Sequence, residues 1–331
     1  MKFTPALCLL ATASAFELTL DSFDVDLGEC LPGVVTCYSG SPSAPPASLA
    51  AADAADYIPT VFMHGLGDSG SNRGMKNIAK SVSSRYPGAY SVAVDVANGM
   101  SSYTHTLESQ VEDFAAAVLA DGNLSRGFNA VGLSQGGLIV RAYVQKHGDD
   151  ASYPAVHNLV SLCGPQGGVG DCPGGTPKSL CSVGKSFMYG AGLSFSGYWK
   201  DTSGDADKAK ATYLEKSPYL ADLNNDKDEK NDVYVKNLQA VNKYVLVEAL
   251  NDTVVMPHAS EQHGFYAWGS TEETELFEET EGYAGDWLGL KTMDANGMID
   301  YHSYEGDHLR WSNEFWDETV LPYLGDTFDA L

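Results

Sequence analysis

A serine flanked by glycines is the first part of this sequence that could do chemistry. Residues 132–136 read Gly-Leu-Ser-Gln-Gly, the pattern G-x-S-x-G, with a strand-like run before them and a helical pattern after them. A sharp turn from a strand into a helix can expose a serine hydroxyl and direct the helix N-terminus at a developing negative charge. Since ordinary glycine and serine usage also produces the bare pattern by chance, the flanking strand and helix carry the prediction that Ser134 is a nucleophile.

A serine hydroxyl is a weak nucleophile and needs a base that a carboxylate holds in one tautomer. Asp252 follows the strand-like run at 243–250, and His308 follows the run at 298–304. The order Ser, Asp, His is the usual one for this motif, and both residues fall at the carboxyl ends of strands, where parallel sheets carry their sites. We therefore predict Ser134 as the nucleophile, Asp252 as the acid and His308 as the base.

Other residues near these positions compete for the same roles. Asp307 adjoins His308, but the side chains of adjacent residues diverge, so Asp307 could tune the imidazole without being its partner. The other histidines between Asp252 and His308 are more typical of surface or core positions, and they are His258, His263 and His302.

A glycine-rich loop follows the first strand-like run. Residues 64–70 read HGLGDSG, and such a loop can direct a main-chain N–H at an oxyanion. We predict that the main-chain N–H groups of Leu66 and Gln135 hold the oxyanion. The alternative for the loop is an ordinary glycine turn.

The elements that must position these residues alternate along the chain. Strand-like runs occur at 60–65, 89–96, 128–133, 158–164, 243–250 and 298–304, and helical patterns at 75–86, 107–120, 135–147 and 313–324. This alternation predicts an α/β fold of the α/β-hydrolase type, with a mostly parallel central sheet flanked by helices. The alternation stops between about 165 and 240, which predicts an insertion within a domain at 58–331.

The N-terminus predicts entry into the secretory pathway. Residues 1–15 combine a lysine, a short apolar stretch and an A-x-A site, as a signal peptide does, and residues 16–57 read as an acidic, Cys-containing lead and a Pro/Ala/Ser-rich linker. Asn123 and Asn251 lie in glycosylation sequons. No later run of 18 apolar residues predicts a transmembrane segment.

The cysteines left after cleavage predict two disulfides in an oxidising compartment. The close pairs Cys30–Cys37 and Cys172–Cys181 each close a short loop that contains proline and glycine. Cys163 is the odd one, and we expect a buried thiol there, with a reactive nucleophile as the less favoured reading.

Charge and motifs exclude several classes of function. The formal net charge of −24 at pH 7 opposes binding to nucleic acid. It suits work at mildly acidic pH, although solubility alone is an equal explanation. The acidic stretch at 222–233 lacks the glycine and the glutamate of a calcium loop, and no H-E-x-x-H or paired CxxC motif is present. We therefore predict no metal and no cofactor.

The motifs together resemble one family, the palmitoyl-protein thioesterases, which are lysosomal depalmitoylating enzymes of the α/β-hydrolase superfamily. The resemblance runs from about Pro59 to Leu324 and rests on HGLGDSG, GFNAVGLSQGG, CPGGTPKSLC, LNDTVVMP, LGLKTMDANG and EGDHL, which occur in the family's order. The chain departs from the family in its additional lead at 16–57. It also lacks the family's paired cysteines after the GDS loop and has Cys163 where glycine is usual.

The resemblance implies the same triad of Ser134, Asp252 and His308, and it implies a helical cap at 165–240 with an apolar groove in which residues 186–199 could take part. It implies a serine thioesterase that removes long-chain acyl groups from S-acylated proteins or peptides, without a cofactor, in a lysosome or vacuole. Secretion is the alternative location. A lipase or esterase acting on oxygen esters, or a catalytically silent lipid-binding form of the fold, remains as an alternative function.

Overall fold

The computed structural model describes residues 56–330 except 175, 177–184, 186–187 and 191. The predicted signal peptide, nearly all of the lead, the Cys30–Cys37 pair and Cys181 therefore lie outside the described residues. Both predicted disulfides stay predictions.

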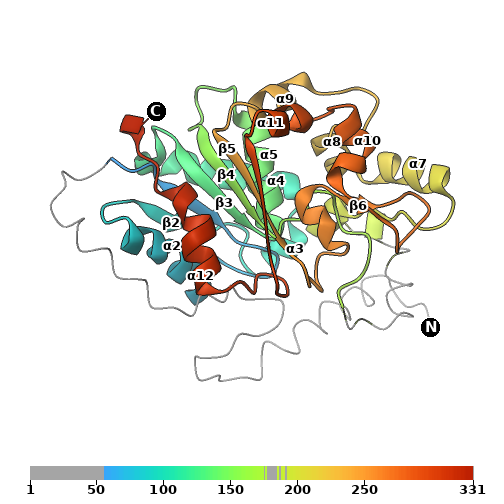
Figure 1. Cartoon of the computed structure of the whole chain (residues 1–331), viewed down its shortest axis with the longest axis horizontal. Coiled ribbons are helices and arrows are strands. Elements are labelled where there is room, and N and C mark those ends of the chain that lie inside the picture. The colour runs from blue at the N-terminus through green and yellow to red at the C-terminus, as the bar shows by residue number, and fades with distance from the viewer. Residues whose placement is uncertain (1–55, 175, 177–184, 186–187, 191, 331) are drawn as a thin grey trace.

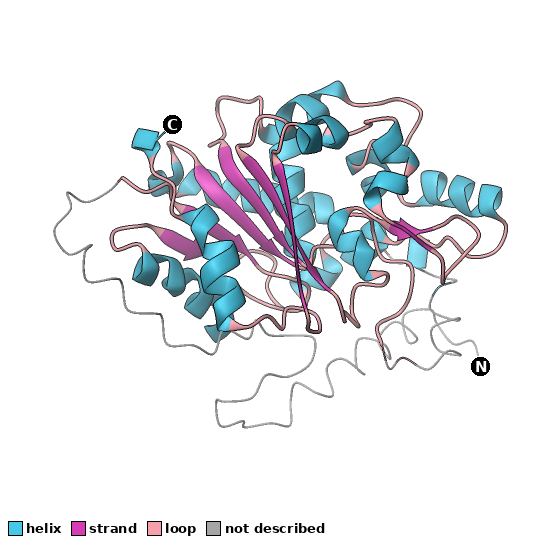
Figure 2. Cartoon of the chain, in the orientation of Figure 1, coloured by secondary structure: helices cyan, strands magenta, loops and turns pink. Residues whose placement is uncertain are grey.

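A parallel sheet forms the centre of the described chain (Figure 2). Its six strands lie in the order β2-β1-β3-β4-β5-β8, and every neighbouring pair is parallel. Their bounds are β1 Thr60–Met63, β2 Ser91–Ala93, β3 Phe128–Leu133, β4 Val156–Leu162, β5 Lys243–Ala249 and β8 Ile299–Tyr304. The predicted α/β fold with a mostly parallel sheet is confirmed.

Helices cover both faces of this sheet (Figure 1). One face packs against α4 (Leu107–Ala120) and α5 (Gln135–His147), and the other against α2 (Arg73–Arg85) and the C-terminal segment. Alternate strand residues face opposite sides, so Val61 and Met63 enter the first core while Phe62 enters the second. This burial on both sides explains why the strands read as continuous apolar runs.

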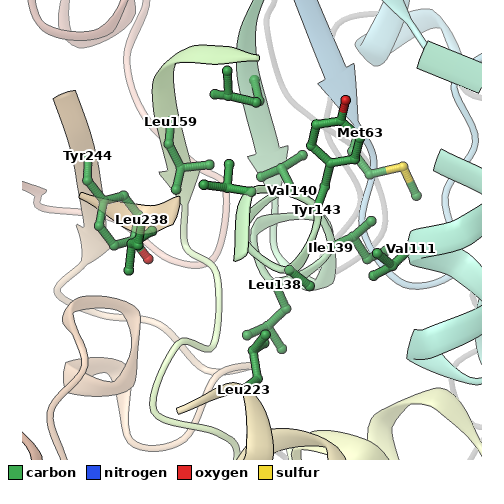
Figure 3. Packing of buried hydrophobic residues seen from close by; sticks show 14 of the residues in the cluster. Met63, Val111, Leu138, Ile139, Val140, Tyr143, Leu159, Leu223, Leu238 and Tyr244 are labelled. Atoms are coloured by element: carbon green, nitrogen blue, oxygen red, sulfur yellow. The ribbon is translucent and has the colours of Figure 1, made fainter. Parts of the chain in front are cut away.

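Helix α5 lies at the centre of the larger core (Figure 3). Leu138, Ile139 and Val140 are fully buried, because one side of the helix faces the sheet and the other faces α4 and later segments. The helix directly follows Ser134, so its packing against both neighbours holds the serine turn in place.

The C-terminal segment differs from the single amphipathic helix predicted for 313–324. It begins as α12 (Asn313–Phe315), continues as a π-helix over Trp316–Val320 and ends as a 3₁₀-helix over Leu321–Leu324. Pro322 has no N–H to donate into an α-helical ladder, so the hydrogen-bond pattern must change near it. The buried Trp316 and Val320 keep the segment packed on the sheet despite the irregular winding.

The segment between β4 and β5 contains several short helices. They are the 3₁₀-helices Met188–Gly190 and Ser194–Tyr198, then α7 (Ala206–Lys216), α8 (Pro218–Leu223) and α9 (Asp232–Leu238). A second excursion lies between β5 and β8. It holds the 3₁₀-helix His258–Gln262, the antiparallel pair β6 (Phe265–Tyr266) and β7 (Thr274–Glu275), the 3₁₀-helix Phe277–Glu279, α10 (Glu281–Ala284) and α11 (Leu290–Ala295). The sequence predicted the insertion at about 165–240 but not this second excursion.

The inserted segment rests on α5. The buried guanidinium of Arg141 donates to Asn224 Oδ1 at 2.8 Å, and Gln145 Nε2 donates to the Leu223 carbonyl at 2.8 Å. Tyr198 donates its hydroxyl to Gln135 Oε1 at 3.1 Å, next to the serine. None of the described helices is both long and apolar enough to cross a membrane.

Candidate active site

Ser134 occupies a strained turn between β3 and α5. Its backbone has φ 54° and ψ −125°, a conformation that residues with a Cβ rarely adopt. The two glycines of the motif are needed for close packing: a Cβ on Gly132 would lie 2.3 Å from the Gly136 carbonyl oxygen, and one on Gly136 would lie 2.3 Å from that of Met63. The backbone therefore has the form of a nucleophile elbow.

The loop at 64–70 packs directly against this elbow. A Cβ on Gly65 would lie 2.9 Å from the Ser134 Cβ, so only glycine allows the loop to approach so closely. The buried ring of His64 contacts the carbonyl oxygens of Gly65 and Val96, at 2.9 and 2.7 Å, and fixes the start of the loop. His64 thus has a structural role.

The two predicted oxyanion donors belong to segments that adjoin Ser134. Leu66 belongs to the loop that touches Ser134, and Gln135 is the first residue of α5. Within the described residues, neither main-chain N–H has a hydrogen-bond partner. The Gln135 side chain is held by Gln110 Oε1 at 3.0 Å and by Tyr198, which restrains the residue that carries one of these donors.

Asp252 and His308 form a buried pair. His308 Nδ1 lies 2.5 Å from Asp252 Oδ2, and His308 and Asp252 are 6% and 5% exposed. Asp252 Oδ1 accepts the N–H groups of Val254 and Val255, at 2.6 and 2.8 Å. Burial alone would raise the pKa of Asp252, but the His308 charge, its hydrogen bond and the other donors outweigh it, so this pKa lies below its ordinary value.

Neighbouring strands bring Ser134 and this pair to one edge of the sheet. Figure 1 shows the strands ending at a common edge, as their parallel order requires. The Ser134 N–H donates to the carbonyl of Leu162, the last residue of β4. Cys163 follows Leu162, and its Sγ lies within 4.8 Å of side-chain atoms of Asp252 and His308. The described residues show no hydrogen bond between Ser134 and His308, and such contacts often form only when substrate binds.

The competing residues make other contacts and do not pair with the His308 ring. Asp307 Oδ1 accepts the N–H and hydroxyl of Thr253, both at 2.9 Å, and so joins the Asp252 loop to the His308 loop. The three other histidines each have a partner away from the pair. His258 contacts Glu248, His263 contacts the Tyr244 hydroxyl and His302 contacts the Tyr323 hydroxyl.

Cys163 is a free, fully buried cysteine, as expected. Its Sγ lies 3.2 Å from the Tyr304 hydroxyl, and burial raises the pKa of its thiol well above 9.0. A reactive cysteine needs a lowered pKa and access to solvent, so the cysteine nucleophile is disfavoured.

Glu261 is a buried acidic residue at the site that sequence analysis missed. Its side chain is fully buried, and its carboxyl oxygen lies within 4.8 Å of ligand atoms of Asp252, His308 and Cys163. These four side chains are a donor set of the kind that holds a metal ion, but the short bond between His308 Nδ1 and Asp252 already occupies two of them. The run PHASEQHG places Glu261 between the polar residues Ser260 and Gln262, so no local pattern signals that this acid is buried.

A separate cavity of about 130 Å³ lies between the two excursions from the sheet. The ammonium of Lys200 lies over the rings of Tyr213, Phe265 and Trp268 in its wall. None of Ser134, Asp252 and His308 lines it, and its wall is strongly charged. This cavity therefore does not correspond to the predicted apolar groove, part of which lies outside the described residues.

The fold and the elbow define an α/β-hydrolase, and comparison with known proteins gives the family. The palmitoyl protein thioesterase family model matches residues 59–308. Palmitoyl-protein thioesterase 3 of Dictyostelium discoideum is 35% identical, covering 80% of this chain and 92% of its own length. Palmitoyl-protein thioesterase 1 of Caenorhabditis elegans is 30% identical (78% and 88%), and the human lysosomal thioesterase PPT2 is 32% identical (82% and 89%).

The chain belongs to the palmitoyl protein thioesterase family. Among solved structures, a monoacylglycerol lipase of Paleococcus ferrophilus matches with 15% identity and a TM-score of 0.42, covering 81% of this chain and 96% of its own. That likeness is too loose to carry an argument.

Proposed function

We propose that this protein is a serine thioesterase that removes long-chain acyl groups from S-acylated proteins or peptides. Ser134 is the nucleophile, His308 the base and Asp252 the acid that orients it. The observation that carries the proposal is the buried hydrogen bond between His308 and Asp252, located beside a serine elbow in a chain of this family.

The reaction follows from the positions of these groups. The Nδ1 bond to Asp252 leaves His308 Nε2 to accept the proton of Ser134 as its oxygen attacks the thioester carbonyl carbon. The main-chain N–H groups of Leu66 and Gln135 stabilise the oxyanion. The carbon–sulfur bond then breaks, the thiol leaves with the proton from His308, and an acyl-serine remains.

Water completes the cycle. His308 takes a proton from water as it attacks the acyl-serine, and the proton returns to Ser134 when the fatty acid leaves. Asp252 stays ionised throughout and stabilises the imidazolium that forms twice in each turnover. The proposal assigns no step to a metal or a cofactor.

We place this activity in a lysosome or vacuole, because relatives from human and rat are named lysosomal thioesterases. The acidic composition of the chain is compatible with that location. Secretion is the alternative, and both require the predicted signal peptide at 1–15.

A paired hydrolysis assay tests the proposal. A palmitoyl thioester and the matching oxygen ester are compared at mildly acidic and neutral pH, with wild type and Ser134→Ala. We expect thioester turnover to exceed ester turnover and to be lost in the variant. Ester preference that is lost in the variant would make the protein a lipase or esterase, and activity that survives the substitution would contradict the role of Ser134.

Labelling with a fluorophosphonate probe separates an enzyme from a catalytically silent lipid-binding protein. The proposal predicts one label, on Ser134, that is absent in Ser134→Ala and in heat-unfolded protein. A folded wild-type protein that takes no label would favour the silent alternative.

A further inference from the structure

Glu261 is a buried neighbour of Asp252, the acid of the proposed triad. It belongs to the 3₁₀-helix His258–Gln262, and its side chain is fully buried. Glu261 Oε2 accepts the N–H of Ala249, the last residue of β5, at 2.8 Å. One of its carboxyl oxygens lies within 4.8 Å of a carboxyl oxygen of Asp252, and its Oε1 is buried without a hydrogen-bond partner among the described residues. A glutamate is thereby anchored to the strand that precedes Asp252, with its carboxyl group next to that of Asp252.

Two carboxyl groups can share a hydrogen bond only when one of them holds a proton. Asp252 accepts from His308 Nδ1 and from the N–H groups of Val254 and Val255, an arrangement that favours its ionised form. No N–H or O–H group among the described residues donates to Glu261 Oε1. The proton of the pair therefore belongs on Glu261.

We propose that Glu261 is a positioning residue that donates a hydrogen bond, as a neutral acid, to Asp252 and so holds that carboxylate toward His308. This inference rests on the proposed function. Glu261 does not touch the reacting atoms, and it acts through Asp252 alone. Its O–H adds a third kind of donor to a carboxylate whose orientation determines the tautomer of the base.

The surroundings keep Glu261 neutral. Burial is the main cause that raises the pKa of Glu261 well above its ordinary value of 4.5, and the negative charges of Asp252 and Glu248 add to it. The other titratable groups facing it are His308, the buried thiol of Cys163 and the Tyr304 hydroxyl. Ionisation of Glu261 would place a second negative charge beside Asp252, which would favour the imidazolium form of His308 and remove the base.

Two substitutions at this position separate positioning from simple packing. In Glu261→Gln, the amide N–H can donate to Asp252 and the amide oxygen can accept from Ala249, so we expect kcat within a few-fold of wild type. In Glu261→Met, which has a similar length and no donor, we expect kcat to fall roughly tenfold to a hundredfold, the loss typical of a hydrogen bond to a charged group, with KM little changed. Glu108→Gln is the control, because the exposed carboxylate of Glu108 pairs with Lys146 and does not act on Glu261.

Two readouts report on the proton itself. In Glu261→Gln, kcat should persist on the alkaline side, where wild type loses activity as Glu261 ionises. The Nδ1 proton of His308, observed as a downfield proton resonance in substrate-free protein, should keep its position in the Gln variant and move or exchange in the Met variant. This resonance can be followed even if the proposed activity is absent.

The outcomes are distinct. Near-wild-type kcat and an unmoved resonance in folded Glu261→Met would overturn the inference, and so would a Gln variant as impaired as the Met variant. If Glu261→Met does not fold, the Gln variant and its pH profile decide. Wild type that is inactive toward both thioester and ester would contradict the proposed function, and the resonance would still test Glu261.

Discussion

At the scale of single residues, the contacts of the site converge on Asp252. It accepts hydrogen bonds from His308 and from two main-chain N–H groups, and in our proposal from the neighbouring Glu261. In Asp252→Asn, the amide cannot accept the Nδ1 proton as a carboxylate does, and the imidazole loses its orientation. We expect kcat to fall by about 10³–10⁴ with little change in KM, as measured by steady-state hydrolysis of a palmitoyl thioester.

The control for this prediction is structural. Because Asn is nearly isosteric with Asp, the near-UV circular dichroism of Asp252→Asn should match that of wild type. A folded Asn variant with less than a tenfold loss of kcat would mean that Asp252 does not orient the base.

The burial of Glu261 also leads to a prediction about the stability of the protein. The folded pKa of Glu261 lies above its ordinary 4.5, so above that pH the unfolded chain releases a proton that the folded protein keeps. Its contribution to the free energy of unfolding is therefore present below pH 4.5 and declines as pH rises toward the folded pKa. We expect the stability of Glu261→Gln relative to wild type to increase from pH 4 to pH 7, as measured by urea unfolding. A difference that stays constant over this range would contradict a neutral Glu261.

At the scale of elements, the elbow depends on contact between α5 and β1. A Cβ on Gly136 would lie 2.3 Å from the Met63 carbonyl oxygen and 2.7 Å from that of His64, so Gly136→Ala must separate the helix from the strand. We expect a loss of about 1–3 kcal/mol in the free energy of unfolding, the usual cost of overpacking, together with loss of Ser134 labelling. Denaturant unfolding and the fluorophosphonate probe measure the two effects.

Gly122→Ala is the matched control for this substitution. A Cβ on Gly122 would meet no atom within 4 Å, so its effect should stay within about 0.5 kcal/mol. Equal effects of the two substitutions would show that the close approach at Gly136 does not matter.

A second prediction at this scale concerns the contact between the inserted segment and the elbow. The Tyr198 hydroxyl joins this segment to the Gln135 side chain beside the elbow. Tyr198→Phe removes one buried hydrogen bond, and we expect a loss of about 1 kcal/mol in stability. We also expect a lower kcat, because Gln135 carries a proposed oxyanion donor. Unchanged kcat and stability would mean that this contact does not support the site.

At the scale of the whole molecule, charge is the dominant feature. The chain has 44 Asp and Glu residues against 20 Lys and Arg residues, and a net charge far from zero destabilises a compact state by self-repulsion. Added NaCl should therefore raise the melting temperature at pH 7 and should do so much less near pH 5, where carboxylates begin to be neutralised. A melting temperature that is independent of salt at pH 7 would contradict this.

Much of the local structure could be predicted from local patterns. The bounds of α4, β3 and α5 agree with the predicted ones, because apolar periodicity defines each element and local signals end it. Thr106 caps α4 by accepting the Ser109 N–H, and the glycines around Ser134 mark the elbow. The helix predicted at 313–324 was only partly correct, because periodicity does not show how Pro322 alters the winding.

The sequence by itself determined the strand and helix alternation, the serine elbow and the family, since each depends on neighbouring residues or on ordered motifs. The tertiary structure alone decided that His308 Nδ1 is hydrogen-bonded to Asp252, 56 residues away in the sequence, and that Glu261 lies next to this pair. The physical reason is that these contacts depend on β5 and β8 lying side by side and on the path of the loop after Asp252. The His308 charge and the hydrogen bonds to Asp252 keep that carboxyl group ionised, while burial leaves Glu261 its proton, and both effects depend on the whole fold.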